Sequence, residues 1–417
     1  MKNFDVPSIF KSPLISAIKN YRKEQDPRKK DFSPTVLDFG AFRILLARHF
    51  GFCYGVENAI EIAYNALAKH PQQHIYFLSE MIHNPEVNAD LQNNGISFIF
   101  DTYGNQLIAW ESLPTNAVVL IPAFGTTLEV AQKLKTIGAI VEVYDTTCPF
   151  VKKVWNRAES LGKNDFTVII HGKPTHEETR ATFSHSSAFS HSLIIKNMDE
   201  AAILADFITQ KRKWQEFDRF FAGRYSAHFQ AEKHLQKIGV VNQTTILADD
   251  TQEIANFLKE TMQHFFGKND LNLHFADTRD TLCYATNENQ NATKALIEQT
   301  ADAAIIIGGY NSSNTTHLVE LCQSVYPTYF IRNATNILAK DKVIHFDISL
   351  KTEICNTEFI RNKQNPSIIL SSGASCPDAL VEETIVRLHA LFPDARPIPT
   401  VVEAFLGENI TPAQNPE

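Results

Sequence analysis

Short apolar runs alternate with amphipathic stretches along most of the chain. The apolar runs lie at 43–47, 74–78, 117–122, 141–144, 167–170, 238–241, 303–307, 328–331 and 367–370. Most of these runs are rich in Val and Ile, as expected for strands that are buried on both faces of a sheet. The pattern therefore predicts strands of the parallel type.

The stretches between these runs carry apolar residues at helical spacing. Examples are Val56, Ile60, Ala63 and Leu67; Leu128, Ala131 and Leu134; and Val151, Val154, Ala158 and Leu161. Strands that alternate with amphipathic helices are typical of parallel sheets covered by helices. The sequence therefore predicts an α/β fold.

The α/β pattern repeats coarsely, because each third of the chain opens with a cysteine-bearing loop followed by a helix. We expect α/β domains at 41–147, 148–282 and 283–380 around a shared centre. The interval 210–236, rich in Lys, Arg, Phe and His, predicts a helical insertion on the surface of the middle domain. Residues 1–40 form an expected N-terminal extension with a helix near Leu14–Arg22, and 381–417 an expected C-terminal helix and tail.

Composition excludes several classes of protein. The net charge of −8 argues against a nucleic-acid-binding protein. No apolar run reaches the roughly 18 residues that a membrane helix needs, and residues 1–31 lack the apolar core of a signal peptide. We therefore expect a cytoplasmic protein in which the six cysteines are reduced.

Cys53, Cys148 and Cys283 share one local context, at the point where an apolar run gives way to a helix. A helix start stabilises thiolate, so we expect lowered pKa values for these thiols. Their wide spacing excludes a ferredoxin-type cluster run and the paired halves of a structural zinc site. Three soft thiolates suit an iron–sulfur cluster that leaves one iron open for substrate.

The remaining cysteines have a simpler interpretation. We expect Cys322 and Cys355 to be small buried core residues, which is the usual position of a lone cysteine. Cys376 stays open, because it lies beside Ser375 in a loop that has the character of a binding site.

Two polar loops follow predicted strands and precede predicted helices, at 308–316 and 371–378. Such loops present backbone N–H groups, hydroxyls and amides at a helix start, which favours an anion site. For either loop alone, N-capping by Ser, Thr or Asn is the better interpretation. Two such loops together favour a phosphate-type ligand.

Histidines and carboxylates lie in other loops that follow strands. His83 follows one strand, and His176 lies beside Glu177 and Glu178 after another. A histidine and a nearby carboxylate can bind an anion and deliver a proton. The spacing does not choose between the two glutamates. Thr244 follows a further strand, where a capped turn is the alternative to a binding role.

These motifs together resemble the 4-hydroxy-3-methylbut-2-enyl diphosphate reductase family. The resemblance rests on Gly-Phe-Cys-Tyr-Gly-Val (51–56), Ile-His-Asn-Pro (82–85), Asp-Thr-Thr-Cys-Pro (145–149), His-Glu-Glu-Thr (176–179), Asn-Gln-Thr-Thr (242–245), Leu-Cys-Tyr-Ala-Thr (282–286), Asn-Ser-Ser-Asn (311–314) and Gly-Ala-Ser-Cys-Pro-Asp (373–378), in that order. It implies three pseudo-symmetric α/β domains in a trefoil around a central [4Fe-4S] cluster.

The resemblance also implies a role for each candidate residue. Cys53, Cys148 and Cys283 match the cluster ligands, and Glu178 matches the carboxylate that supplies a proton. The positions matching substrate contacts are Thr244 for the alcohol and His83, His176, Ser312, Ser313, Asn314 and Ser375 for the diphosphate. The implied reaction forms isopentenyl and dimethylallyl diphosphate, with ferredoxin or flavodoxin as electron donor.

One segment departs from the shorter bacterial pattern. Pro-Ala-Phe-Gly at 122–125 places Phe124 where that pattern has a diphosphate-binding histidine. A phenyl ring donates no hydrogen bond, so one phosphate contact is missing or supplied elsewhere. The segment, the N-terminal extension and the insertion resemble the plant and cyanobacterial branch of the family.

Two other classes of protein remain as alternatives. A non-enzymatic iron–sulfur sensor would use the three cysteines but would not need Glu178 or the Ser/Asn loops. A zinc-dependent hydrolase would use the same thiols without iron, and metal analysis separates it from the reductase.

Overall fold

The chain forms two compact units. The computed structural model describes residues 4–141, 144–277, 281 and 283–407. Of these, 4–54, 83–85 and 287–407 form unit 1, and 55–82 and 86–286 form unit 2. The three predicted domain ranges and the trefoil stay predictions.

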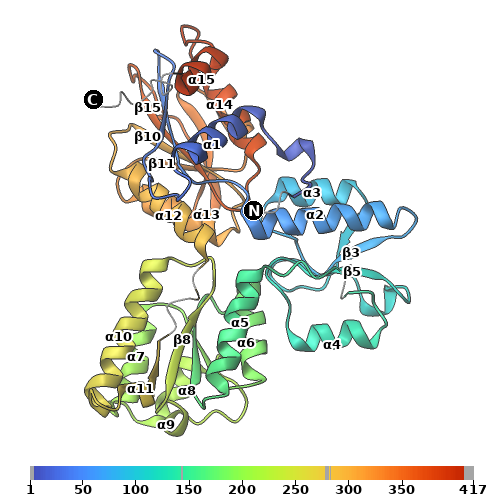
Figure 1. Ribbon diagram of the computed structural model, residues 1–417, viewed down its shortest axis with the longest axis vertical. Helices are drawn as coiled ribbons and strands as arrows, with labels where there is room; N and C mark the ends of the chain where they lie inside the picture. The colour runs from blue at the N-terminus through green and yellow to red at the C-terminus, as the bar shows by residue number, and fades with distance from the viewer. Residues whose placement is uncertain (1–3, 142–143, 278–280, 282, 408–417) are drawn as a thin grey trace, which may run out of the picture. The chain divides into compact units, whose positions relative to one another are not determined.

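Unit 1 is built on a five-stranded sheet with the order β1-β2-β15-β10-β11 (Figure 1). The strands are β1 (Thr35–Asp38), β2 (Arg43–Leu46), β10 (Ala303–Ile307), β11 (Thr328–Ile331) and β15 (Ser367–Ser372). Only the β1–β2 pair is antiparallel. β10 and β15 are buried along their whole length, as the apolar runs predict for central parallel strands.

Helices and a small antiparallel sheet complete unit 1. The helices are η1 (Ser8–Phe10), α1 (Pro13–Gln25), α12 (Tyr284–Ile297), α13 (Ser313–Gln323), η6 (Ala334–Asn336), α14 (Asp378–His389) and α15 (Ile398–Gly407). The small sheet contains β12 (Ile337–Ala339), β13 (Lys342–Asp347) and β14 (Thr352–Asn356). α15 lies in the predicted tail and buries Val401 and Val402, so part of the described tail is helical.

The N-terminal segment is part of the unit 1 core. The predicted helix near Leu14–Arg22 is present as α1, capped by the Ser12 hydroxyl, which accepts a hydrogen bond from Ile15 N at 2.9 Å. Ile15 and Ile18 are buried in the core cluster. β1 is a strand that the sequence did not predict. Its buried residues alternate with the exposed Val36 and Asp38, so it lacks the continuous apolar run of a central strand.

Unit 2 contains two parallel sheets. The first has the order β4-β3-β5 and contains β3 (Ile75–Phe77), β4 (Ile96–Phe98) and β5 (Val118–Leu120). Its sequence neighbours are α2 (Tyr54–Lys69), α3 (Pro85–Asn93), η2 (Trp110–Ser112) and α4 (Leu128–Thr136). The predicted strand at 141–144 lies partly outside the described residues.

The second sheet of unit 2 positions most of the candidate chemistry. Its order is β7-β6-β8-β9, with β6 (Thr167–His171), β7 (Ser192–Ile195), β8 (Ile238–Asn242) and β9 (Phe275–Ala276) all parallel. The helices of this region are α5 (Pro149–Gly162), α6 (Glu177–Ser187), α7 (Met198–Ile208), α10 (Ala248–Phe266) and α11 (Leu271–His274). The predicted α/β class is confirmed.

The 210–236 interval carries short helices and is partly buried. It contains η4 (Trp214–Glu216), α8 (Phe217–Phe221) and α9 (Ala231–His234). Phe217 and Phe221 are buried in the core of this region. Ser226 N donates to Ser192 O and Ile194 N donates to Arg224 O, so the insertion also borders β7.

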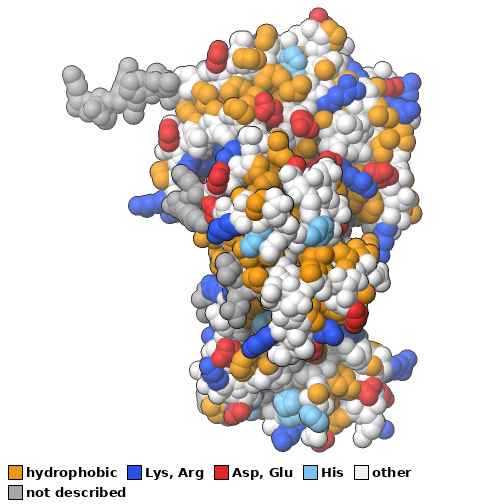
Figure 2. Space-filling view, turned by 90° about the vertical axis from the view of Figure 1, so that its right-hand side faces the viewer, with side chains coloured by type: hydrophobic (Ala, Val, Ile, Leu, Met, Phe, Trp, Pro, Cys, Tyr) orange, Lys and Arg blue, Asp and Glu red, His pale blue; other side chains and the backbone are white. Residues whose placement is uncertain are grey.

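The described surface mixes apolar and charged side chains. On the face drawn in Figure 2, small groups of hydrophobic side chains are separated by charged and polar ones. Among the described residues, no helix is both long enough and apolar enough to cross a membrane.

Candidate functional site

A buried carboxylate and a threonine meet at the carboxyl ends of β6 and β8. Glu178 lies in the first turn of α6, and Thr244 follows β8. Thr244 Oγ1 donates to Glu178 Oε2 at 3.0 Å, and Thr244 N donates to Oε1 at 2.5 Å. Only 1% of Glu178 is exposed, whereas Glu177 is partly exposed. The structure therefore brings together Glu178 and Thr244, which the sequence alone could not pair.

The environment of Glu178 prepares it to hold a proton near neutral pH. Burial raises the pKa of this carboxyl to about 7, although both Thr244 hydrogen bonds lower it. Removing a carboxylate from water disfavours its charged form, and here that cost exceeds the gain from the two donors. A carboxyl with such a pKa is suited to general acid catalysis.

Gln243 and Gly172 support the pair. Gln243 is buried, and its Oε1 accepts from Lys173 N and Thr179 Oγ1, both at 3.1 Å. A Cβ at Gly172 would lie 2.6 Å from Thr179 Oγ1, so the loop after β6 needs glycine to approach α6. Gln243 lies in the Asn-Gln-Thr-Thr motif, but the sequence did not indicate that it joins the loop after β6 to α6.

Two of the candidate cysteines lie in the same part of unit 2. Cys148 is the N-cap residue of α5, and Cys283 directly precedes α12. Phe150 and Tyr284, near these two cysteines in sequence, pack with ring centroids 4.9 Å apart. The Glu178 carboxylate acts electrostatically on both thiols, so the thiols and the carboxylate share one region.

The prediction of lowered thiol pKa values is wrong for Cys148 and Cys283. Burial raises the pKa of Cys148 to about 12 and also raises that of Cys283. Backbone N–H groups at the helix starts do oppose the shift, but desolvation outweighs them. Buried thiols of this kind ionise on binding a metal, whose positive charge offsets the cost.

Gly55 allows the backbone to pass close to Cys148. A Cβ at this position would lie 2.6 Å from the Cys148 sulfur, so any larger residue would displace the sulfur. The glycine belongs to the Gly-Phe-Cys-Tyr-Gly-Val motif, which gives a packing reason for its presence there.

His176 and Phe124 lie beside the carboxylate. His176 Nδ1 accepts from Glu178 N at 3.2 Å, which caps α6. Phe124 packs edge-on against the His176 ring, with centroids 5.7 Å apart and an interplanar angle of 86°. The phenyl ring thus fixes the orientation of the imidazole rather than offering a hydrogen bond of its own.

In unit 1, the two polar loops lie together at the start of α13. Asn314 Oδ1 accepts from Ala374 N at 2.9 Å, which joins the loop after β10 to the loop after β15. A Cβ at Gly308 or Gly373 would come within 2.7 Å or 2.0 Å of Thr315 Oγ1. These glycines therefore allow both loops to close around the helix start.

Among the Ser and Asn side chains of the two polar loops, some cap a helix and others do not. Ser312 caps α13, since its Oγ accepts from Thr315 N at 3.3 Å. Ser375 Oγ instead donates to His83 O at 3.2 Å, and the N-cap of α14, Pro377, has no side-chain cap. Asn314 Nδ2 is buried without a hydrogen-bond partner. An anion would satisfy this donor.

Cys53 joins the same group in unit 1. Cys53 N donates to Ala374 O at 3.2 Å, in the loop that carries Ser375. Lys19 Nζ holds the preceding loop by donating to Phe50 O and to Asp378 Oδ1, at 2.9 and 2.7 Å. Unit 1 thus gathers one cysteine, His83 and the Ser/Asn loops, and unit 2 gathers the other two cysteines with Glu178.

The other cysteines divide differently from the prediction. Cys322 is buried in the core, as predicted, and Cys376 is buried there as well. Cys355 is exposed on β14, so its prediction as a core residue is wrong. Among the described residues, no group of three or more His, Cys, Asp or Glu side chains is arranged to hold a metal ion.

The sequence comparisons agree with the motifs. The model of the LytB protein family matches residues 44–389. A relative from Trichormus variabilis (strain ATCC 29413 / PCC 7937) is 38% identical over 88% of this chain and 88% of its own length. One from Synechococcus sp. (strain CC9311) is 38% identical over 85% of this chain and 87% of its own. Both are named 4-hydroxy-3-methylbut-2-enyl diphosphate reductase, and the resemblance seen in the motifs is confirmed.

A solved structure shares the fold. It is the E-1-hydroxy-2-methyl-but-2-enyl-4-diphosphate reductase from Plasmodium falciparum, with a TM-score of 0.60 and 23% identity. The match covers 84% of this chain and 89% of that one. From the family match and the identity to these relatives, we conclude that the chain belongs to the LytB protein family.

Proposed function

We propose that the protein reductively removes the hydroxyl group of 4-hydroxy-3-methylbut-2-enyl diphosphate. The substrate takes up two electrons and two protons, its C–O bond breaks and water leaves, giving isopentenyl or dimethylallyl diphosphate. This reaction is the last step of the methylerythritol phosphate route to isoprenoids. The names of the relatives support it. The observation that carries it is the buried Glu178–Thr244 pair in the same region as the partly buried Cys148 thiol and the buried Cys283 thiol.

Glu178 supplies a proton in this proposal. Its raised pKa keeps a large fraction of the carboxyl protonated near pH 7. Thr244 holds the carboxyl through both oxygens and is placed to contact the substrate alcohol. Because the pair is buried, the proton is delivered without competition from bulk water.

The diphosphate is bound by neutral donors and histidines. His83, Ser312, Ser313, Asn314 and Ser375 lie in unit 1, and His176 lies beside Glu178 in unit 2. The free Asn314 Nδ2 supports this assignment. So does the start of α13, where backbone N–H groups favour an anion. Phe124 contributes by orienting His176.

Cys53, Cys148 and Cys283 would hold a [4Fe-4S] cluster. The donors fit, because soft thiol sulfur suits iron and Cys148 and Cys283 lie in one shielded region. When bound, such a cluster supplies the electrons and a Lewis-acidic iron that carries no cysteine. Ferredoxin or flavodoxin as electron donor, and the cytoplasm as compartment, belong to the same proposal.

Anaerobic turnover of the hydroxylated diphosphate with reduced methyl viologen tests the function. Formation of the two isoprenoid diphosphates supports it. No product from protein with a full complement of iron would overturn it. A colourless protein with stoichiometric zinc and no iron would favour the hydrolase alternative instead.

A further inference from the structure

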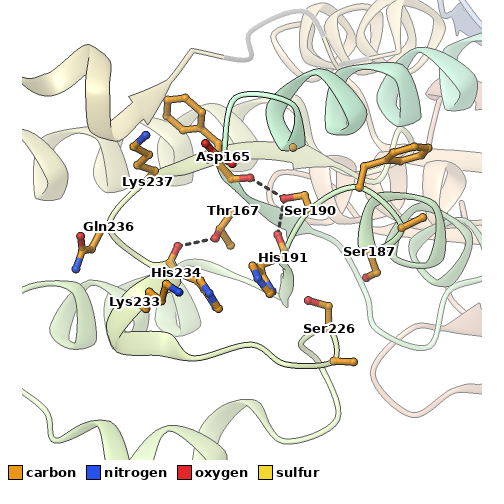
Figure 3. A pocket seen from close by; sticks show the side chains of 15 residues that line it. Asp165, Thr167, Ser187, Ser190, His191, Ser226, Lys233, His234, Gln236 and Lys237 are labelled. Carbon is orange, nitrogen blue, oxygen red and sulfur yellow. Dashed lines mark hydrogen bonds between the residues drawn. The ribbon is translucent and has the colours of Figure 1, made fainter.

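A pocket opens at the amino ends of β6, β7 and β8, at the opposite end of the sheet from Glu178. It encloses about 640 Å³ and is shown in Figure 3. This volume lies within the range of small-molecule sites, roughly 300–1,000 Å³. The candidate active-site residues do not line it, and the proposed reaction gives it no role.

The 210–236 insertion forms one wall of this pocket. Ser226, Lys233, His234 and Gln236 come from the insertion. Ser226 Oγ accepts from Ser192 N at 3.0 Å, which ties this wall to the start of β7. Thr167 Oγ1 donates to His234 O at 2.5 Å, which ties it to β6 (Figure 3). The insertion is thus fastened to the sheet on both sides of the hollow.

The lining carries an excess of positive charge. Lys233 and Lys237 both line the pocket, and among the described residues neither forms an ion pair. Asp165 is the one carboxylate in the described lining. Two ammonium groups with a single carboxylate in the lining favour an anionic occupant.

Two histidines add proton-dependent charge. The rings of His191 and His234 stack with centroids 3.6 Å apart and an interplanar angle of 13°. Burial lowers both pKa values, and Lys233 lowers them further, with His228 also acting on His191 and His191 on His234. The charged groups that act on this pair are therefore all positive, and an anion would relieve their repulsion.

Hydroxyls and apolar groups complete the lining. Ser187 Oγ is buried without a hydrogen-bond partner, and Ser226 Oγ keeps its own proton to donate. Phe166 and Phe189 supply apolar surface. Neutral donors beside two ammonium groups suit a doubly charged phosphate, and the phenyl rings suit an organic ester group.

We propose that this pocket binds a small phosphate ester, and that the insertion exists to build the site. The two lysines match the double charge of a phosphate monoester, and the serines offer hydrogen bonds to its oxygens. The aromatic side chains contact the ester body. The site is separate from the one that binds the proposed diphosphate substrate.

Calorimetric titration of the full-length holoenzyme with phenyl phosphate tests this. We expect one binding event that weakens at least about tenfold in Lys233→Ala/Lys237→Ala, since both charges of the phosphate lose their partners. The matched control is Lys211→Ala/Lys213→Ala, which removes two lysines of the same insertion outside the pocket and should bind as the wild type does. Benzoate, with a single charge, should bind about tenfold more weakly or worse.

A candidate active-site variant separates the two anion sites. Binding should persist in Ser375→Ala, and its loss there would assign the phosphate to the other site and overturn the proposal. Unchanged affinity in the double-lysine variant, or no binding to the wild type, would also overturn it. Circular dichroism establishes that each variant is folded, and the result does not depend on whether the enzyme turns over.

The histidine pair predicts the sign of the pH effect. Inorganic sulfate keeps its double charge between pH 6 and 8, so any change in its affinity comes from the protein. Binding should be several-fold to about tenfold tighter at pH 6, because the anion favours protonated imidazole. Equal or weaker binding at pH 6 would contradict the part assigned to His191 and His234.

Discussion

The two ends of the β7-β6-β8-β9 sheet differ in the charge and the burial of their polar side chains. At the carboxyl end, a single carboxylate is buried, and Thr244 satisfies both of its oxygens. At the amino end, two lysines and two histidines line an open pocket with one carboxylate in the described lining. β6 is five residues long, so the ends lie roughly 17 Å apart.

The difference shows what burial does to a polar group. Burial at the carboxyl end shifts the proton affinity of one residue strongly and prepares it for chemistry. At the amino end, Lys233 is exposed and Lys237 is partly exposed, so both side chains are accessible to a ligand. One end is therefore suited to moving a proton and the other to holding an anion.

Glu178→Gln should have the largest effect on the carboxyl end. Glutamine keeps the shape of the side chain but cannot donate a carboxyl proton, so turnover should fall at least about 10²-fold. Iron content and substrate affinity should stay close to wild type, which steady-state kinetics and metal analysis measure. Normal turnover in this variant would rule out Glu178 as proton donor.

The pH dependence of turnover follows from the same group. Burial raises the pKa of Glu178 to about 7, and the donor form is the protonated one. Turnover should therefore fall as pH rises above 7, approaching tenfold per pH unit. The residual activity of Glu178→Gln should not show this fall above pH 7. A wild-type turnover that stays constant up to pH 9 would contradict the role of Glu178 as proton donor.

Thr244→Val tests whether the threonine tunes the carboxyl. The hydrogen bond from the Thr244 hydroxyl lowers the pKa of Glu178. Its loss should raise that pKa, and the pH above which turnover falls should increase by about one unit. If Thr244 had a purely structural role, the variant would lose activity but turnover would still begin to fall at the wild-type pH. Thr244→Ser, which keeps the hydroxyl, should restore the wild-type pH dependence.

Lys233→Ala/Lys237→Ala should have the smallest effect on turnover. Without an added phosphate ester, the change should stay within about twofold, because charges this distant are screened by salt. Steady-state assays in a sulfate- and phosphate-free buffer measure it. A large loss of turnover here would show that the two ends of the sheet are not independent.

The sequence predicted the central strands well, because burial on both faces leaves continuous apolar runs. Predicted runs at 303–307 and 328–331 coincide with β10 and β11. Short or partly exposed strands were missed, among them β4 and the β12–β14 sheet. Their apolar signal is too short or too irregular to stand out from that of a loop.

The candidate site was predictable as a set of residue types but not as an arrangement. Motifs singled out Glu178 and Thr244 separately, and only the fold shows that they share two hydrogen bonds. The thiol pKa values were predicted with the wrong sign, because sequence reveals a helix start but not the depth of burial around it.

Helix α6 touches both ends of the sheet. Its first turn holds Glu178, and its last residue, Ser187, lines the phosphate pocket. A ligand that displaced this helix at one end would also be felt at the other. By thermodynamic reciprocity, any factor by which a phosphate ester changes substrate affinity is the factor by which substrate changes affinity for the ester. In that case, binding of either ligand would change the affinity of the protein for the other through α6.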